Sequence, residues 1–478
     1  MQWRGVNGGA AVPNSIPMLD LMFFLTESQD NPRHVGAVQV FRRPRLGGAK
    51  VVPQIIEAYR RAVPQAPFNR VPVFPKAGRP QWREVDEIDM RHHVLHMALP
   101  APGSDEQLHA LVAELHAPML DRSRPGWKTY FIEGLAGDRF AIYHKVHHAL
   151  VDGESGMEIM VRSLSTSASD RRIRPTIAAA HRARTPPPPP PHLEAVRERA
   201  VASLARGSLS VGRGTLRLLE DAFSGLRGYS AAQARPFTAP DTPMNESITN
   251  ARSVSHTCFP LAAFKAAARA RQATINDVAL AIVDAGMNRY LREMGRPPEH
   301  PLVAICPVSL HGSGEKQATT LASAIWPVLG PVRSPMTKRL AAIAESTRAE
   351  KARLGQLGRE AAYAYAVATF GLIELMVAAR PDSLGMRPAN VLVSNVRGPT
   401  QALYLNGARL ETLFPVSTLI VGLGLNITFM SYGRQVIMGF TANGAALPEV
   451  ESLARYTQEA FEELVAASGR PARHTSRR

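Results

Sequence analysis

The chain has 478 residues, of which 45% are hydrophobic and 20% are charged, and its formal net charge is +16. This composition is typical of a globular protein long enough for two to four domains, each with a core of its own. The two cysteines, Cys258 and Cys306, lie in apolar segments and are expected to pack as small hydrophobic residues. No disulfide framework or cysteine-rich zinc site is therefore implied, which fits a reducing compartment.

The positive charge comes mainly from scattered arginine residues, and the chain lacks the basic stripes and the motifs of nucleic-acid-binding proteins. We therefore expect no nucleic-acid partner. The surplus charge is compatible with simple solubility, with a phosphorylated small molecule or with an anionic membrane surface. Composition alone leaves these three explanations open.

Two segments bear on membrane insertion. Residues 1–17 contain no continuous apolar stretch of the kind that forms a signal peptide. Residues 361–379 reach the length of a membrane span, but they are rich in alanine and include Gly371 and Glu374. We predict a buried helix there rather than a span, so that a lipid substrate would be met at a surface.

The first half of the chain, up to about residue 165, alternates between helical and strand patterns. The predicted helices are 15–28, 51–63 and 104–120, and the predicted strands are 34–41, 127–135 and 139–148.

The composition changes at residues 166–192, which end in the six consecutive prolines Pro186–Pro191. A proline run prefers a stiff polyproline II conformation and continues neither a helix nor a central strand. It could dock a partner or act as a spacer. We interpret it, together with the Arg-rich helical region 193–228, as part of a connector between two halves.

A second α/β region begins near residue 253. The predicted helices are 275–295 and 336–355, and the predicted strands are 300–310, 390–399, 409–417, 422–432 and 434–442. A turn at Gly433 and Arg434 joins the last two strands in a hairpin. No period of 20–50 residues recurs, so the chain consists of two α/β halves rather than a repeat array.

The segment HKVHHALVDGESG, residues 144–156, holds three histidines, an aspartate and two glycines. Because side chains alternate along a strand, His148 ends a mostly apolar row and His147 points to the opposite face. Ser155 and Glu158 match a capping box, which predicts that a helix begins there.

Asp152 and Gly153 then lie in a tight crossing from strand to helix, where glycine permits an unusual backbone angle or the close approach of a ligand.

Three interpretations of these histidines are open: a metal site, a structural histidine and a catalytic base. His144 and His148 share a strand face, but their Cα atoms would lie roughly 13 Å apart at about 3.3 Å per residue, which disfavours a metal site. A histidine that ends a buried strand is kept neutral by burial and can accept a proton. The remaining cluster, His92, His93 and His96, has no framing motif and is predicted to consist of strand and surface histidines.

HHALVDG, residues 147–153, matches the HHxxxDG signature of acyltransferases with the chloramphenicol-acetyltransferase-like fold, a superfamily that includes the condensation domains of peptide synthetases and plant alcohol acyltransferases. Further segments in order resemble the bacterial wax ester synthase/acyl-CoA:diacylglycerol acyltransferase family. They are PMLDLMFFLTES, HVGAVQVF, RPGWKTYFIEGL, TPMNESITNAR, INDVALA, CPVSL, SNVRGP and GLNITFMSY. The ordered set covers most of the chain and is far more specific than the seven-residue motif.

Three positions depart from the family pattern. Gly126 replaces the leucine of Pro-Leu-Trp, His311 ends the Pro-x-Ser-x-Arg segment in place of arginine, and Arg397 replaces the first proline of Ser-Asn-Val-Pro-Gly-Pro. We therefore expect the core chemistry to transfer better than the pocket shape or the acceptor preference.

The resemblance implies an α/β (α+β) fold of two chloramphenicol-acetyltransferase-like domains, each a mixed sheet with flanking helices, with an active-site channel between them. The expected divisions are 1–180 for the N-terminal domain with the motif, 181–240 for the Pro-rich and helical connector, 241–470 for the C-terminal domain and 471–478 for a disordered basic tail.

The same resemblance implies roles for individual residues. His148 is expected to be the general base, His147 to orient the turn, and Asp152 to fix the crossing through a structural ion pair. Asn276 either donates to the oxyanion or caps its own helix, since Asn is a favoured N-cap residue. Asp277 is expected to be structural.

Gly153, Ser394 and Asn395 are the candidate substrate-binding residues. Ser394 and Asn395 follow a strand in a Gly-Pro turn, where they would line the channel, although ordinary turn chemistry explains them equally well.

The resemblance also implies the reaction: transfer of a long-chain acyl group from acyl-CoA to diacylglycerol, a long-chain alcohol, or both, with acyl-CoA as a substrate and neither cofactor nor metal. A lipid acceptor leads us to expect peripheral contact with an anionic membrane or a lipid droplet, in the cytoplasm at the inner face of the plasma membrane. The alternatives are a condensation-type enzyme that uses carrier-tethered acyl groups and an inactive lipid-binding protein of the same fold. The oligomeric state is left open.

Overall fold

The computed structural model describes residues 15–45, 47–76, 78–179, 239–309, 322–356 and 387–468. The predictions for Pro186–Pro191, His311, the apolar run 361–379 and the tail 471–478 lie outside these residues. Among the helices that the described ranges contain, none combines the length and hydropathy that a membrane crossing requires.

The first half follows the predicted order of elements, with additions. The helices are α1 (Met18–Thr26), α2 (Gly48–Arg61), α3 (Met90–His93), α4 (Asp105–His116), α5 (Gly153–Ser163) and α6 (Thr176–Ala179). The strands are β1 (His34–Arg42), β2 (Arg70–Val73), β3 (Gln81–Glu84), β4 (Val94–Ala98), β5 (Trp127–Leu135) and β6 (Arg139–His147). The three predicted helices correspond to α1, α2 and α4 and the three predicted strands to β1, β5 and β6. The additional elements are α3, α6, β2, β3 and β4.

The second half likewise contains the predicted helices and strands. The helices are the 3₁₀ turn η2 (Pro243–Asn245), α9 (Leu261–Ala270), α10 (Ile275–Glu293), α11 (Met336–Gly355) and α13 (Val450–Ser468). The strands are β7 (Arg252–Pro260), β8 (Ala304–Ser309), β9 (Ala322–Ile325), β10 (Val391–Val396), β11 (Tyr404–Leu405), β12 (Ala408–Val416), β13 (Leu425–Tyr432) and β14 (Gln435–Asn443). The predicted hairpin is confirmed, because Tyr432 pairs with Gln435 across a turn in which Gly433 has φ of 56°.

The strands form two six-stranded mixed sheets, which confirms the predicted fold class. The first sheet has the order β11-β12-β1-β6-β5-β4, and β4 and β5 are its parallel pair. The second has the order β7-β14-β13-β10-β8-β9, with β10 parallel to both β13 and β8. A separate two-stranded sheet is formed by β2 and β3.

The chain returns to the first sheet after it has begun the second. Strands β11 and β12 follow β10 in sequence, but β12 pairs antiparallel with β1, from Gly36 opposite Val416 to Arg42 opposite Arg409. Residues 404–416, which belong to the C-terminal half in sequence, therefore form part of the first sheet. We call this arrangement the strand exchange, and it was not part of the predicted division of the chain.

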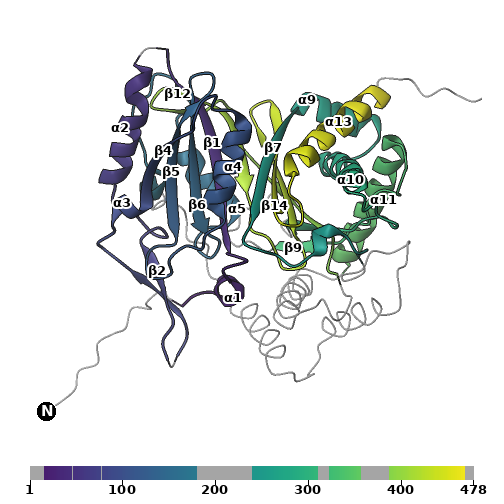
Figure 1. Ribbon diagram of the computed structural model, residues 1–478, viewed down its shortest axis with the longest axis horizontal. Helices are drawn as coiled ribbons and strands as arrows, with labels where there is room; N and C mark the ends of the chain where they lie inside the picture. The colour runs from purple at the N-terminus through teal and green to yellow at the C-terminus, as the bar shows by residue number, and fades with distance from the viewer. Residues whose placement is uncertain are drawn as a thin grey trace, which may run out of the picture.

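The two halves pack closely side by side, with α4 between the sheets and α9, α10, α11 and α13 gathered around the second sheet (Figure 1). A Cβ atom on Gly439 of β14 would lie only 2.2 Å from the carbonyl oxygen of Pro415 in β12, so glycine permits this approach. His109 of α4 is also hydrogen-bonded to His256 of β7, at 2.8 Å. These contacts hold the C-terminal half against the sheet that carries the histidine motif.

Candidate active site

The helix that follows the histidine motif, α5, is capped by a residue other than the predicted Ser155. Helix α5 begins at Gly153, and the carboxylate of Asp152 accepts a hydrogen bond of 2.7 Å from the backbone N–H of Ser155. The prediction that Ser155 begins the helix is therefore wrong. Both residues are good N-caps, but Ser155 lies in the first turn, where its N–H is the donor that the cap satisfies.

Backbone contacts hold the two motif histidines at the end of β6. The N–H of His147 donates to the carbonyl oxygen of Gly126 at 2.7 Å, and the N–H of His148 donates to that of Arg33 at 2.9 Å. The carbonyl oxygen of His147 accepts from Leu150 at 2.9 Å, which closes a tight turn. The chain thus leaves β6 immediately after the histidines, with both backbones fixed.

Helix α1 covers both histidines with successive aromatic rings. Phe23 stacks on His148 with ring centroids 4.3 Å apart and an interplanar angle of 16°. Phe24 stacks on His147 at 4.2 Å and 9°. Each imidazole therefore has its own aromatic partner, and the apolar helix predicted at 15–28 forms one wall of the site.

The face of β6 that carries Lys145 and His147 is buried, although the alternation of side chains along the strand predicted the apolar row on the face of His148. His147 is 3% exposed and Lys145 2%, whereas His148 is half-buried. The ammonium group of Lys145 donates to the carbonyl oxygens of Leu115 and Pro118, and burial lowers the pKa of Lys145 to about 7. Thus, the partly accessible histidine of the pair is His148.

The surroundings of His148 favour a neutral imidazole. Burial is the largest cause that lowers the pKa of His148, and the positive charge of Arg33 lowers it further, although a backbone hydrogen bond of His148 itself and the charge of Asp152 act in the opposite direction. Its Nδ1 atom is buried and makes no hydrogen bond within the described part of the chain. A neutral imidazole is what proton acceptance requires.

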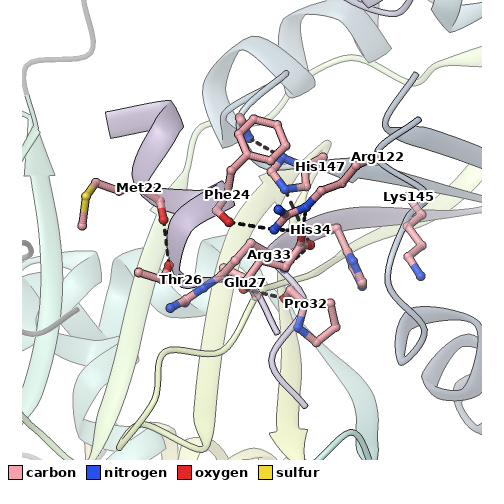
Figure 2. Close-up of polar contacts among 12 residues, drawn as sticks. Met22, Phe24, Thr26, Glu27, Pro32, Arg33, His34, Arg122, Lys145 and His147 are labelled. Atoms are coloured by element: carbon pink, nitrogen blue, oxygen red, sulfur yellow. Dashed lines mark hydrogen bonds and ion pairs between the residues drawn. The ribbon is translucent and has the colours of Figure 1, made fainter. Parts of the chain in front are cut away.

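The sequence did not single out Glu27, which ends α1 as its C-cap residue. Its carboxylate, with a fully buried side chain, accepts from the N–H of Arg33 at 3.1 Å and from Nε of Arg122 at 3.0 Å. The same carboxylate lies 3.6 Å from Nε2 of His147. Figure 2 shows Arg122 reaching both Glu27 and the carbonyl oxygen of Phe24.

Burial raises the pKa of Glu27, but the contacts with His147, Arg33 and Arg122 outweigh it and lower that pKa overall, so the group is ionised. The only local signal in the sequence is an acidic residue directly after an apolar helix, which is too common to identify a site.

Two asparagines of the second half lie together at the start of α10. Nδ2 of Asn395 donates to Oδ1 of Asn276 at 2.8 Å. The cap of α10 is Thr274, in a capping box with Asp277, so the alternative that Asn276 caps this helix is wrong. Asp277 also accepts from the hydroxyl of Thr347 at 2.6 Å, as expected of a structural residue.

Ser394 and Asn395 belong to strand β10, not to a turn after it as predicted. The end of this strand meets the histidine motif, because a Cβ atom on Gly153 would lie 3.6 Å from Cγ2 of Val396. The structure therefore brings the start of α5 next to the strand that carries Ser394 and Asn395.

The departure at Gly126 lies directly against the motif. A Cβ atom there would be 3.0 Å from Cβ of His147 and 3.3 Å from Cδ1 of Leu150. A small pocket adjoins it, lined among others by Phe24, Trp82 and His147. Arg397, a second departure, is exposed after the end of β10.

The other histidine clusters have structural surroundings. His93 ends the short helix α3, is 1% exposed and is hydrogen-bonded to the carbonyl oxygen of Trp127, so the prediction of a strand or surface histidine is wrong for it. His144 is hydrogen-bonded to Thr129, and burial lowers its pKa to about 4. In the described ranges, no three His, Cys, Asp or Glu side chains gather as potential metal ligands.

Family models match both halves of the chain. The wax ester synthase/diacylglycerol acyltransferase catalytic domain matches residues 17–279, and the C-terminal domain of the same family matches residues 318–465. The protein therefore belongs to the wax ester synthase/diacylglycerol acyltransferase family, and the expectation of an acyl-CoA-dependent O-acyltransferase is confirmed at the level of that family.

Individual relatives agree with this assignment. A Mycobacterium tuberculosis protein assigned as a diacylglycerol O-acyltransferase is 36% identical over 94% of this chain and 90% of its own. A second assigned protein of that organism is 34% identical over 96% of this chain and 98% of its own. The solved wax ester synthase/diacylglycerol acyltransferase from Marinobacter aquaeolei VT8 is 28% identical, with a TM-score of 0.76, over 96% of this chain and 100% of that structure.

The fold extends to more distant enzymes. The first condensation domain of the calcium-dependent antibiotic synthetase superimposes with a TM-score of 0.56 at 14% identity, over 97% of this chain and 98% of that one. This likeness shows the shared fold alone and agrees with the chloramphenicol-acetyltransferase-like architecture expected from the motif.

The cap of α5 yields a stability prediction. We expect Asp152→Ala to lower the free energy of unfolding by about 1 kcal/mol, because the Ser155 N–H loses its acceptor, and Asp152→Asn to retain most of the stability. Urea denaturation followed by circular dichroism measures both. Glu158→Ala, which removes an exposed ion pair with Arg162 on the same helix, should cost less than about 0.5 kcal/mol. Equal losses for the two alanine variants would contradict the role of the cap.

Proposed function

We propose that this protein transfers a long-chain acyl group from acyl-CoA to the hydroxyl of diacylglycerol, a long-chain alcohol, or both, with His148 as the general base. The observation that carries the proposal is a half-buried histidine with a lowered pKa, at the start of a capped crossing, in a chain of the wax ester synthase/diacylglycerol acyltransferase family. Acyl-CoA is the donor substrate, and the reaction needs neither a cofactor nor a metal.

In the proposed step, His148 removes the proton of the acceptor hydroxyl while the oxygen attacks the thioester carbonyl carbon. A C–O bond forms, and the carbonyl oxygen becomes an oxyanion. Collapse of this intermediate breaks the C–S bond, and His148 returns the proton to the CoA thiolate. The thioester is already activated, so positioning and oxyanion stabilisation are the remaining requirements.

We assign oxyanion stabilisation to Asn276 in this proposal. Because its Oδ1 accepts from Asn395, its own Nδ2 group keeps two hydrogens for donation. Ser394 and Asn395, on β10 next to the crossing, and Gly153, at the start of α5, would then border the channel between the halves. This placement agrees with the approach of Gly153 to β10, where a Cβ atom added to Gly153 would lie 3.6 Å from Cγ2 of Val396.

The general-base assignment is tested with His148→Ala. Purified enzyme is incubated with radiolabelled palmitoyl-CoA and either dioleoylglycerol or hexadecanol, and the lipid products are separated. We expect the variant to lose about 10²- to 10⁴-fold in rate, because a positioned base contributes that much. His96→Ala, which removes an exposed histidine paired with Glu133, should behave like the wild type. Absence of both esters with the wild type would refute the function, whereas an active H148A variant would refute only the base.

The lowered pKa of His148 predicts the pH dependence. Because catalysis requires the neutral imidazole, kcat/KM should fall as the pH drops through the folded-state pKa of His148, with its midpoint below 6.5.

The stability of the fold should also depend on pH, because burial lowers the pKa values of His34 and His116 as well. As the pH falls below about 6.5, the unfolded chain therefore binds more protons than the folded protein, and the free energy of unfolding declines. Circular dichroism at each pH separates unfolding from titration. A midpoint above 6.5 in folded protein would contradict the assignment.

We also propose a surface through which the enzyme meets its lipid substrates. Helix α1 and the β2–β3 hairpin lie at the same edge of the molecule, where the hairpin extends away from the first sheet (Figure 1). The exposed apolar residues there are Leu25 (64% exposed), Phe74 (45%) and Val73 (36%). Lys76 and Arg79 in the turn are exposed as well, and residues 71–80 include no acidic side chain.

These features support docking to an anionic phospholipid bilayer. Apolar and aromatic side chains next to basic ones suit the boundary between headgroups and acyl chains. The surface also leads to the site, because Phe74 contacts Phe24, with ring centroids 5.7 Å apart, and Phe24 stacks on His147. An acceptor lipid would thus enter beside the histidine pair. The location at the inner face of the plasma membrane or on lipid droplets stays a prediction.

Sedimentation with vesicles tests this surface. We expect wild-type protein to bind vesicles of phosphatidylcholine with phosphatidylglycerol better than phosphatidylcholine alone, and Leu25→Glu with Phe74→Glu to reduce binding on the order of tenfold. Both proteins should acylate hexanol from hexanoyl-CoA at similar rates, since these substrates need no bilayer. Val465→Glu, at a residue that is 38% exposed on α13, serves as the matched control. Unchanged binding of the double variant would exclude this surface.

A further inference from the structure

We propose that Glu27 is a positioning residue for the reaction: it holds the ring of His147, and through it the turn that presents His148. The inference rests on the proposed function of His148. It starts from the placement of a carboxylate whose side chain is fully buried in contact with the histidine motif. A buried charge is costly unless it is paired and hydrogen-bonded, and the pairing here joins α1, β1 and the end of β6.

The first step concerns the protonation of His147. Its Nδ1 atom accepts a hydrogen bond of 3.2 Å from the backbone N–H of Ala149. An accepting Nδ1 has no proton, so in the neutral ring the proton is on Nε2. That Nε2 atom faces Oε1 of Glu27 at 3.6 Å. The carboxylate therefore selects the tautomer that leaves Nδ1 available to the turn.

The second step concerns the turn itself. The N–H of Ala149, in the peptide group that follows His148, donates to the ring of His147, the residue that precedes His148. The orientation of the His147 ring therefore helps to set the direction of the His148 side chain. The stack of Phe24 on His147 holds the same ring from the side of α1. A proton acceptor must lie within hydrogen-bond reach of its substrate, and an error of about 1 Å can cost about 100-fold in rate.

A further contact ties the carboxylate to the backbone of His148. Glu27 accepts from the N–H of Arg33, and the carbonyl oxygen of Arg33 accepts from the N–H of His148 at 2.9 Å. Arg122 bonds both Glu27 and the carbonyl oxygen of Phe24. Replacement of Glu27 by glutamine keeps one acceptor oxygen, for Arg33, and removes the negative charge that faces both His147 and Arg122. The His147→Ala background separates the proposed effect on His147 from the loss at Arg122.

The test is a double-mutant cycle in kcat with Glu27→Gln, His147→Ala and the double variant. We expect Glu27→Gln to lower kcat about 10- to 100-fold, with KM for palmitoyl-CoA changed less than about twofold and the melting temperature nearly unchanged. In the His147→Ala background the same substitution should cost less than about threefold, because residues that act as one unit are not additive. Additive effects, or an E27Q variant as active as the wild type, would overturn the proposal.

Glu133→Gln is the matched control. Glu133 also pairs with an arginine and a histidine, Arg43 and His96, both at 2.5 Å. It lies near the end of β5 that points away from the motif, since Trp127 at the start of β5 pairs with Val146. Its replacement removes the same kinds of contact away from the motif, and kcat should stay within about twofold of the wild type.

A second measurement does not depend on turnover. In protein labelled with ¹⁵N-histidine, ring spectra should show His147 with its proton on Nε2, assigned by the loss of its signals in His147→Ala. Glu27→Gln should shift this tautomer equilibrium or broaden the signals, whereas Glu133→Gln should not. A wild-type His147 with its proton on Nδ1 would overturn the positioning role. If the wild-type enzyme forms no ester, the proposed function fails instead, and the two failures are distinguished.

Discussion

The pairing of the start of β1 with the end of β6 is the constraint on which the site depends. His34 lies opposite His147 in this antiparallel ladder, and Arg33 continues it to the backbone of His148. The chain that leads into β1 must therefore pass over the motif, which places α1 on the histidines. The stacks of Phe23 and Phe24 and the contacts of Glu27 all follow from this register.

Local patterns predicted most helices and strands and the general position of the site. They did not decide which of two neighbouring residues caps a helix. Asp152 and Ser155 are both good N-caps, as are Thr274 and Asn276, and in each pair the earlier residue is the one that caps the helix. Long-range features were beyond such patterns. Nothing local to Glu27 indicates that it meets residue 147, and nothing local to residues 404–416 indicates that they return to the first sheet.

Buried charges mark the part of the structure where function and stability compete. A hydrophobic residue at Glu27 or Lys145 would avoid the cost of burying an ionised group. Each of these charges instead satisfies backbone groups near the motif: Glu27 accepts from Arg33, and Lys145 donates to the carbonyl oxygens of Leu115 and Pro118. Burial raises the free energy of the charged forms, and these hydrogen bonds offset that cost. The same hydrogen bonds fix the positions of the backbone groups around the turn that carries the histidines.

The strand exchange explains why such a turn can serve a reaction that needs two substrates. The base comes from the first half, whereas Asn276 and Asn395 come from the second, so their relative position must not drift. Strand β12 pairs along the length of β1, and Gly439 of β14 lies against Pro415 of β12. The same β1 that fixes the histidines through β6 is therefore hydrogen-bonded, on its other edge, to a strand of the C-terminal segment. Strand β1 thus joins the strand that leads to the base to β12, which packs against the second sheet, where β10 carries Asn395.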